Sequence, residues 1–142
     1  MRIWSILLTA LLAFISTAAL AAGSSVGYEM GGPYARFEPV VDRYNKSGEL
    51  FRIDGHCQSS CTLFLGIRNV CIGPGAEFFF HSPHDNLRNP SPYYLKLFLP
   101  HYNGRLRAYL LAQHALEKVD PFFPVSGSDM IHKFGYRACP KT

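Results

Sequence analysis

The chain has 142 residues, 48% of them hydrophobic, and a formal net charge of +4 at pH 7. Beyond Arg2 its basic side chains are scattered from Arg36 to Lys141 without a cluster, which gives little support to nucleic-acid binding. The length suits one domain with one modest hydrophobic core and leaves no room for a second domain.

The first 21 residues have the three parts of a secretory signal peptide. Arg2 supplies the early positive charge, an apolar run occupies residues 3–15, and Ala19-Leu20-Ala21 fits the small-residue cleavage pattern. The apolar run is shorter than the roughly 20 residues that a membrane-spanning helix needs. We therefore expect cleavage after Ala21 and export of residues 22–142 as a periplasmic or secreted domain without a stable membrane span. The alternative is an uncleaved membrane anchor.

Four stretches have helical patterns, namely residues 34–44, 60–67, 93–119 and 125–136. In the first, apolar residues recur at the 3, 4, 7 spacing of one helix face, although Pro39 interrupts it. The third is expected to break or kink at Pro100, because proline lacks a backbone N–H. The fourth suits a short helix capped by Ser126 or Ser128 and closed by Gly135.

Short apolar runs bounded by turn residues predict strands at residues 26–30, 50–53, 70–72 and 76–80. These strands alternate with the predicted helices along the chain. Such alternation is typical of an α/β domain in which crossover helices join parallel strands. We therefore expect residues 22–142 to form a single α/β domain.

All four cysteines lie in the expected exported part of the chain: Cys57, Cys61, Cys71 and Cys139. Because exported proteins meet an oxidising compartment, two disulfides are the default expectation. A bond between Cys57 and Cys61 is the least favoured pairing, since these residues are only four apart across a turn. The alternative is a zinc site that adds His81 and His84 to these two cysteines, but the usual C-x₂-C spacing is absent, and we expect no metal.

Two chemically capable side chains border the predicted helix 60–67. Ser60 follows a strand and the Asp54-Gly55 turn, at a helix start where free N–H groups and the helix dipole stabilise negative charge. His81 stands directly after the apolar run 76–80, as a histidine at the end of a buried strand would. The pattern favours a nucleophile and a base near each other. The alternative is ordinary capping by Ser59 or Ser60 and a structural histidine.

Five short motifs follow one another along the chain: Gly31-Gly32, CQSSCTL from Cys57, AEFFFH ending at His81, DPFFPVS from Asp120, and FGY from Phe134. Their order and spacing resemble the Clp protease proteolytic subunit and the wider Clp/crotonase superfamily, especially its exported bacterial members of unassigned function. The resemblance covers most of the chain from Gly31 onward. It implies a compact, truncated Clp/crotonase-like α/β domain with repeated strand–helix units.

The resemblance also implies a serine hydrolase or peptidase that acts on an acyl bond, most often a peptide bond, without a cofactor. It places the nucleophile on Ser60, the general base on His81 and the orienting acid on Asp120, with Asp129 as second choice. The implied substrate is a peptide or protein, and a homo-oligomer is compatible with the family.

The same resemblance implies an oxyanion hole formed by backbone N–H groups. One donor falls on Gly31 or Gly32, the paired glycines after the first expected strand, and the other on Cys61, one residue past the nucleophile. The chain departs from the family at Glu29-Met30, where Ser-Pro is usual, and in its shorter N-terminal part.

These departures favour, as an alternative, a catalytically inactive envelope protein that binds a partner or has a structural role. A serine–lysine peptidase using Lys96 is less favoured, because nothing around that residue indicates a buried amine with a lowered pKa. A nucleophilic Cys61 is disfavoured further, since a disulfide would consume its thiol.

Overall fold

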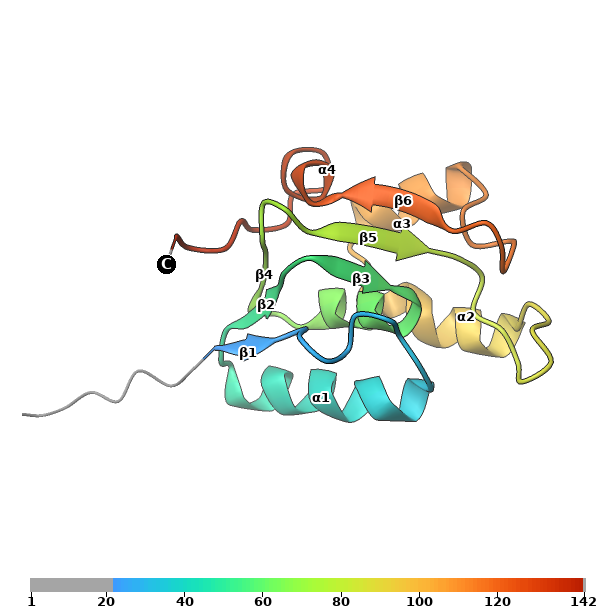
Figure 1. Cartoon of the computed structure of the whole chain (residues 1–142), viewed down its shortest axis with the longest axis horizontal. Helices are drawn as coiled ribbons and strands as arrows, with labels where there is room; N and C mark the ends of the chain where they lie inside the picture. Colours follow the sequence, from blue (N-terminus) through green and yellow to red (C-terminus); the bar gives the residue numbers. More distant parts are fainter. Residues whose placement is uncertain (1–21, 142) are drawn as a thin grey trace, which may run out of the picture.

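The computed structural model describes residues 22–141, so the predicted signal peptide at residues 1–21 lies outside the described residues. Within this range the elements are β1 (Gly23–Ser24), α1 (Tyr34–Ser47), β2 (Phe51–Ile53), β3 (His56–Gln58), η1 (Ser59–Gly66), β4 (Val70–Ile72), β5 (Glu77–Phe80), α2 (Pro92–Phe98), η2 (Leu99–His101), α3 (Gly104–Ala112), β6 (Phe123–Ser126) and α4 (Gly127–His132). Both η segments are 3₁₀ helices. Figure 1 shows the mixed α/β arrangement that the sequence predicts.

The strands form two small sheets. One has the order β1-β2-β4 and is parallel, whereas the other has the order β3-β5-β6, with β3 and β5 parallel and β6 antiparallel. The predicted strand at residues 26–30 is wrong, because that segment forms turns through Gly27, whose φ of 88° breaks an extended chain. The first strand lies earlier, where the Gly23 N–H donates to the Leu50 carbonyl at 2.9 Å.

The helices follow their predicted positions with four differences. In the region 125–136, residues 125–126 belong to β6 and α4 covers only Gly127–His132, with Ser126 as its N-cap. α1 runs on to Ser47 and ends at Gly48, whose left-handed φ of 72° forms the C-cap. The predicted helix 60–67 is a 3₁₀ helix, η1, which packs against α1. The region 93–119 is divided into α2, η2 and α3, with η2 around Pro100 and the Asn103 side chain accepting from Leu106 N–H to cap α3.

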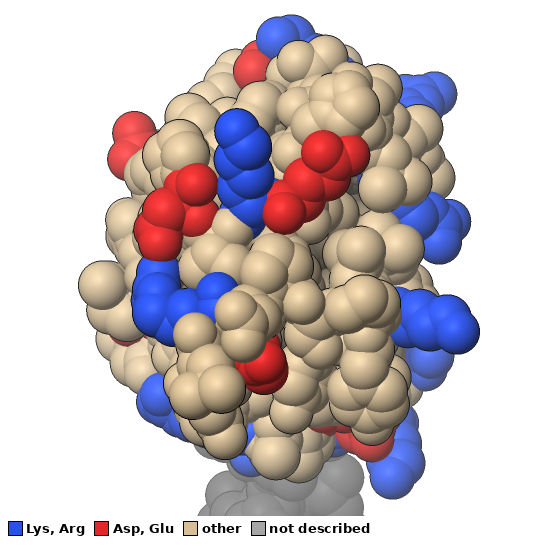
Figure 2. All heavy atoms as spheres, turned by 90° about the vertical axis from the view of Figure 1, so that its right-hand side faces the viewer, with Lys and Arg blue, Asp and Glu red and all other residues tan. Residues whose placement is uncertain are grey.

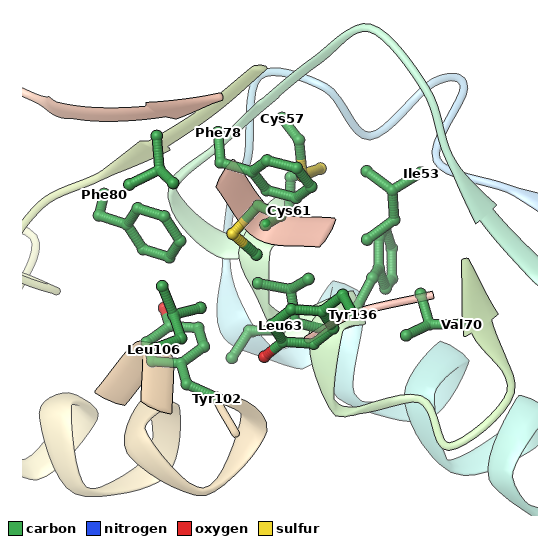
Figure 3. Close-up of a cluster of buried hydrophobic side chains, with 14 of the residues drawn as sticks. Ile53, Cys57, Cys61, Leu63, Val70, Phe78, Phe80, Tyr102, Leu106 and Tyr136 are labelled. Atoms are coloured by element: carbon green, nitrogen blue, oxygen red, sulfur yellow. A yellow bond between two sulfur atoms is a disulfide. The ribbon is translucent and has the colours of Figure 1, made fainter. Parts of the chain in front are cut away.

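The hydrophobic core lies where the two sheets meet η1 and the helices. An aromatic cluster of Phe37, Phe51 and Phe64 joins α1, β2 and η1, with ring centroids 4.7 to 5.4 Å apart. Figure 3 shows a neighbouring part of the core, in which Phe78 and Phe80 of β5 lie near the side chains of η1 and α3. These fully buried contacts fix β5 and η1 relative to each other, and the two elements border the candidate site.

The four cysteines form two disulfides, as predicted, but the expectation about pairing is wrong. Cys57 bonds Cys61, and Cys71 bonds Cys139. The chain turns sharply at Ser59, whose φ is +54°, and this turn brings the Cα atoms of Cys57 and Cys61 to 5.2 Å, within the ordinary disulfide range. Both cysteines of the alternative zinc site are therefore oxidised and supply no thiolate.

No helix within residues 22–141 combines the length and the apolar character needed to span a lipid bilayer.

Candidate active site

A cleft of about 560 Å³ opens between the N-terminal end of α1, the start of η1, the segment after β5 and α2. Ser60 and His81 both line it, together with Gly32 from the segment before α1. β3 and β5 run toward this side of the molecule (Figure 1), which faces the viewer in Figure 2. Most of the visible surface there is uncharged, and acidic and basic side chains alternate in its upper half.

Ser60 is held by the glycine pair before α1. Its side chain is 4% exposed, and its hydroxyl donates to the Gly32 carbonyl at 2.6 Å. Gly31 packs directly on the turn, because a Cβ atom added at Gly31 would lie 2.8 Å from Ser59 Cβ and 3.0 Å from the Gln58 carbonyl oxygen. The glycine pair therefore permits the close backbone approach that places Ser60 at the cleft wall.

His81 follows the last residue of β5, as the apolar run predicted. The ring is 7% exposed, packs against Phe122 with centroids 4.7 Å apart, and its Nδ1 has no hydrogen-bond partner in the described part of the chain. Burial, followed by the nearby His84, lowers the pKa of His81 to about 4, although the charge of Asp120 raises it. The imidazole is therefore neutral at pH 7 and can accept a proton.

The structure brings Ser60 and His81 to one cleft without joining them by a hydrogen bond. The Ser60 hydroxyl donates to Gly32 instead, so its proton does not point at the imidazole. A serine becomes a strong nucleophile only when a base lies within hydrogen-bond reach, about 2.6–3.2 Å. In the described structure Ser60 and His81 therefore line the same cleft without a hydrogen bond between them.

Asp120, the predicted acid, does not bond His81 in this structure. Its carboxylate pairs with the Arg88 guanidinium at 2.5 Å. The Arg88 side chain is 60% exposed and the Asp120 side chain is 66% exposed. The charge of Asp120 nevertheless raises the pKa of His81, although Asp120 does not line the cleft. Asp129, the second choice, pairs with Lys133 in α4 at 3.0 Å and does not line the cleft.

The candidate oxyanion donors differ in their availability. The Gly31 N–H donates to the Tyr28 carbonyl at 3.1 Å, whereas the Gly32 N–H donates no hydrogen bond within residues 22–141. Gly32 also lines the cleft. Cys61 follows Ser60, is bonded to Cys57 and does not line the cleft. Of the two glycines, Gly32 is therefore the one whose N–H has no partner within residues 22–141.

An aromatic wall of the cleft was not predicted from the sequence. Tyr34 from α1 and Tyr94 and Phe98 from α2 line the cleft, with ring centroids about 6 Å apart. Burial, followed by the Glu38 carboxylate, raises the pKa of Tyr34 to about 12, so its hydroxyl stays neutral. The sequence feature that could have indicated this wall is the run of aromatic residues after Pro92, but the run fits an ordinary helix equally well.

No protein-family model matches the chain, and no curated protein shows significant sequence similarity to it. The relationship to the Clp/crotonase superfamily therefore remains an inference from the motifs. Assignment of the site depends on the contacts described above.

Proposed function

We propose that this protein is an exported serine hydrolase of the Clp/crotonase type that cleaves an acyl bond, most often a peptide bond. The observation that carries the proposal is the shared cleft, which is lined by Ser60, by the buried, neutral His81 and by Gly32, whose N–H donates no hydrogen bond within residues 22–141. Two disulfides are consistent with the oxidising compartment that the signal-peptide pattern predicts.

Catalysis in this cleft requires one exchange of hydrogen bonds. The Ser60 hydroxyl leaves the Gly32 carbonyl and donates to His81 when a substrate carbonyl enters the cleft. Ser60 Oγ then attacks the carbonyl carbon while His81 takes the hydroxyl proton, which it later returns to the leaving group. The Gly32 N–H stabilises the negative oxygen of the tetrahedral intermediate.

Asp120 has a supporting role in this proposal. A carboxylate that accepts from His81 Nδ1 fixes the orientation of the ring and stabilises the imidazolium that forms during the reaction. His81 Nδ1 has no hydrogen-bond partner among residues 22–141, and the charge of Asp120 raises the pKa of the ring. Release of Asp120 from Arg88 would therefore complete a triad around the Ser60–His81 pair.

A fluorophosphonate probe, which reacts with activated serines, tests the proposal on the purified mature protein. We expect labelling of the wild type and its loss in Ser60→Ala and in His81→Gln. Ser128→Ala is the matched control, because Ser128 Oγ lies 3.3 Å from His132 Nδ1 on an exposed helix face, outside the cleft. Loss of labelling in the control, or equal labelling of wild type and Ser60→Ala, contradicts the assignment.

A second candidate function is binding without catalysis, as in an inactive family member. It is favoured by the Ser60–Gly32 hydrogen bond and by the absence of an acid bonded to His81 Nδ1 in the described residues. The same cleft, with its aromatic wall, would then hold an apolar segment of a partner. An unlabelled wild-type protein that is folded and oxidised at both disulfides supports this function over hydrolysis.

A further inference from the structure

The Cys57–Cys61 disulfide encloses the turn that presents Ser60 to the cleft. β3 ends at Gln58 and η1 begins at Ser59, so the bond joins the last strand residues to the first helical turn directly across the candidate nucleophile. Both cysteines are fully buried, and Figure 3 shows them beside Phe78 of β5. The bond therefore anchors this turn in the core.

Besides the disulfide, the turn is restrained by two side-chain hydrogen bonds, in which the Ser60 hydroxyl donates to the Gly32 carbonyl at 2.6 Å and the Thr62 hydroxyl donates to the Ser59 carbonyl at 2.7 Å. η1 is a 3₁₀ helix, a form with poorer hydrogen-bond geometry than an α-helix, and its N-cap residue Gln58 makes no side-chain capping bond. Ser59 has a φ of +54°, which is unfavourable for a residue other than glycine. The Gln58 N–H donates to the Glu29 carbonyl at 2.9 Å, which fixes the strand side of the turn. On the helical side, the disulfide adds a covalent restraint to the hydrogen bonds of Ser60 and Thr62.

We propose that the Cys57–Cys61 bond is a positioning element of the active site, which holds the Ser59 conformation and thereby fixes the direction of Ser60 Oγ and the Cys61 N–H. This inference rests on the proposed hydrolase function. The bond spans only four residues, whereas Cys71–Cys139 spans 68, so it restricts the unfolded chain less. Its main effect is expected on the geometry of the site. Because its sulfur atoms are buried, it acts as a permanent restraint.

The test compares two double variants that each lose one disulfide, Cys57→Ala/Cys61→Ala and Cys71→Ala/Cys139→Ala. Fluorophosphonate labelling is measured at several probe concentrations, under conditions where circular dichroism shows both variants folded, to separate the maximal labelling rate from the probe affinity. We expect the first variant to lose about 10- to 100-fold in maximal rate with little change in affinity, because small misplacements of a nucleophile are costly. The second should label like the wild type.

Amide hydrogen exchange provides a readout that a purely stabilising role would not change. Exchange in residues 58–62 should accelerate in Cys57→Ala/Cys61→Ala and stay at the wild-type rate in the other double variant. Should the first variant fail to fold, Cys57→Val/Cys61→Ala refills the buried volume and takes its place.

The outcomes separate this inference from the proposed function. A wild type that does not label contradicts the hydrolase function, and the positioning inference with it. A wild type that labels, with both double variants labelling at its maximal rate, leaves the function standing and overturns the positioning role. A maximal labelling rate that falls equally in both double variants also overturns the positioning role, because the loss would then follow from lower global stability.

Discussion

The Cys57–Cys61 bond closes a four-residue turn beside the cleft, whereas the Cys71–Cys139 bond joins residues 68 apart and ties the C-terminal tail to β4. The tail lies at the end of the molecule opposite the segment that follows β5 (Figure 1). Backbone hydrogen bonds support this second connection, because Ile72 accepts from Cys139 N–H at 2.8 Å and donates to the Arg137 carbonyl at 2.8 Å. The tail is thus held by a disulfide and by backbone hydrogen bonds, whereas the Ser60 turn combines its disulfide with the side-chain hydrogen bonds of Ser60 and Thr62.

The two disulfides illustrate that such a bond can act on global stability or on local conformation. A disulfide that closes a long loop removes more freedom from the unfolded chain, and so contributes more to global stability. A disulfide that closes a short turn restricts the unfolded chain less, yet it can determine the local conformation of the folded protein. We therefore expect stability to depend more on the bond at the tail, and chemistry to depend on the bond at the cleft.

The largest expected effect is on the free energy of unfolding. Loss of the 68-residue connection in Cys71→Ala/Cys139→Ala should lower it by about 4 kcal/mol, against about 2 kcal/mol for Cys57→Ala/Cys61→Ala. Urea unfolding of the oxidised proteins, followed by circular dichroism, measures both values. The reverse order of stabilities would contradict the division of roles between the two bonds.

The next largest effect is a decrease in the free energy of unfolding at acidic pH, caused by protonation of His81 beside the cleft. Because the pKa of His81 falls from 6.5 in the unfolded chain to about 4 in the folded protein, the unfolded state binds more protons between these values. Stability is therefore complete above pH 6.5 and declines by about 3 kcal/mol as the pH falls toward 4.

Urea unfolding at several pH values measures this decline. His81→Gln should remove most of it, whereas Cys71→Ala/Cys139→Ala should keep the wild-type slope at a lower overall stability. His132→Gln is the control, because His132 is exposed on α4. An unchanged slope in His81→Gln would show that other groups carry the acid sensitivity.

A smaller effect is expected from alanine at Gly31, which packs against the Ser60 turn. The matched control is Gly48→Ala, because the two glycines have nearly equal φ values of 74° and 72°, but a Cβ at Gly48 would meet nothing within 4 Å. Both variants bear the conformational cost of positive φ, roughly 1 kcal/mol, and Gly31→Ala adds a clash worth about 1 kcal/mol or more.

Thermal unfolding and fluorophosphonate labelling distinguish the two glycine variants. Gly31→Ala should label more slowly than the wild type, because its Cβ displaces Ser59, while Gly48→Ala should label at the wild-type rate. Equal labelling of the two variants would mean that the turn tolerates displacement, which would weaken the view that its conformation controls Ser60.

Local patterns in the sequence account for much of the fold. α1 follows from its apolar spacing and from Gly48, and the strands β4 and β5 follow from short apolar runs. β3 could not be predicted in this way, because His56-Cys57-Gln58 has only one apolar residue and is too short to show a period; it is held as a strand by pairing with β5. Tertiary contacts determine the secondary structure of such short segments more than intrinsic propensity does.

The candidate site was predictable only in part, for a similar reason. Ser60 and His81 stand at the ends of elements that pattern alone could locate, and both line the cleft. The Cys57–Cys61 pairing depends on the positive φ of Ser59, and the partner of Asp120 depends on how the segment after His81 folds. Neither property is encoded in the spacing of apolar residues.

The smallest effect on stability is expected from Arg88→Gln, which breaks the ion pair with Asp120. Exposed ion pairs contribute little, so the free energy of unfolding should change by about 0.5 kcal/mol or less. Labelling of Ser60 should nevertheless become faster by a few-fold, equivalent to about 1 kcal/mol in the barrier, because the freed carboxylate can orient His81. Loss of the Arg88 charge also raises the pKa of His81 toward its ordinary value, which makes the ring a stronger base.

The double variant Arg88→Gln/Asp120→Asn decides whether that gain passes through Asp120. If Asp120 is the orienting acid, the double variant should label as slowly as Asp120→Asn alone, because freeing an amide gives His81 no carboxylate. Arg107→Gln, which changes an exposed arginine on α3, controls for the loss of one positive charge. Equal labelling of Arg88→Gln and the double variant would instead assign the effect to the charge of Arg88 itself. The Ser60 turn and its disulfide would then support a two-residue site, in which His81 is held by its packing against Phe122.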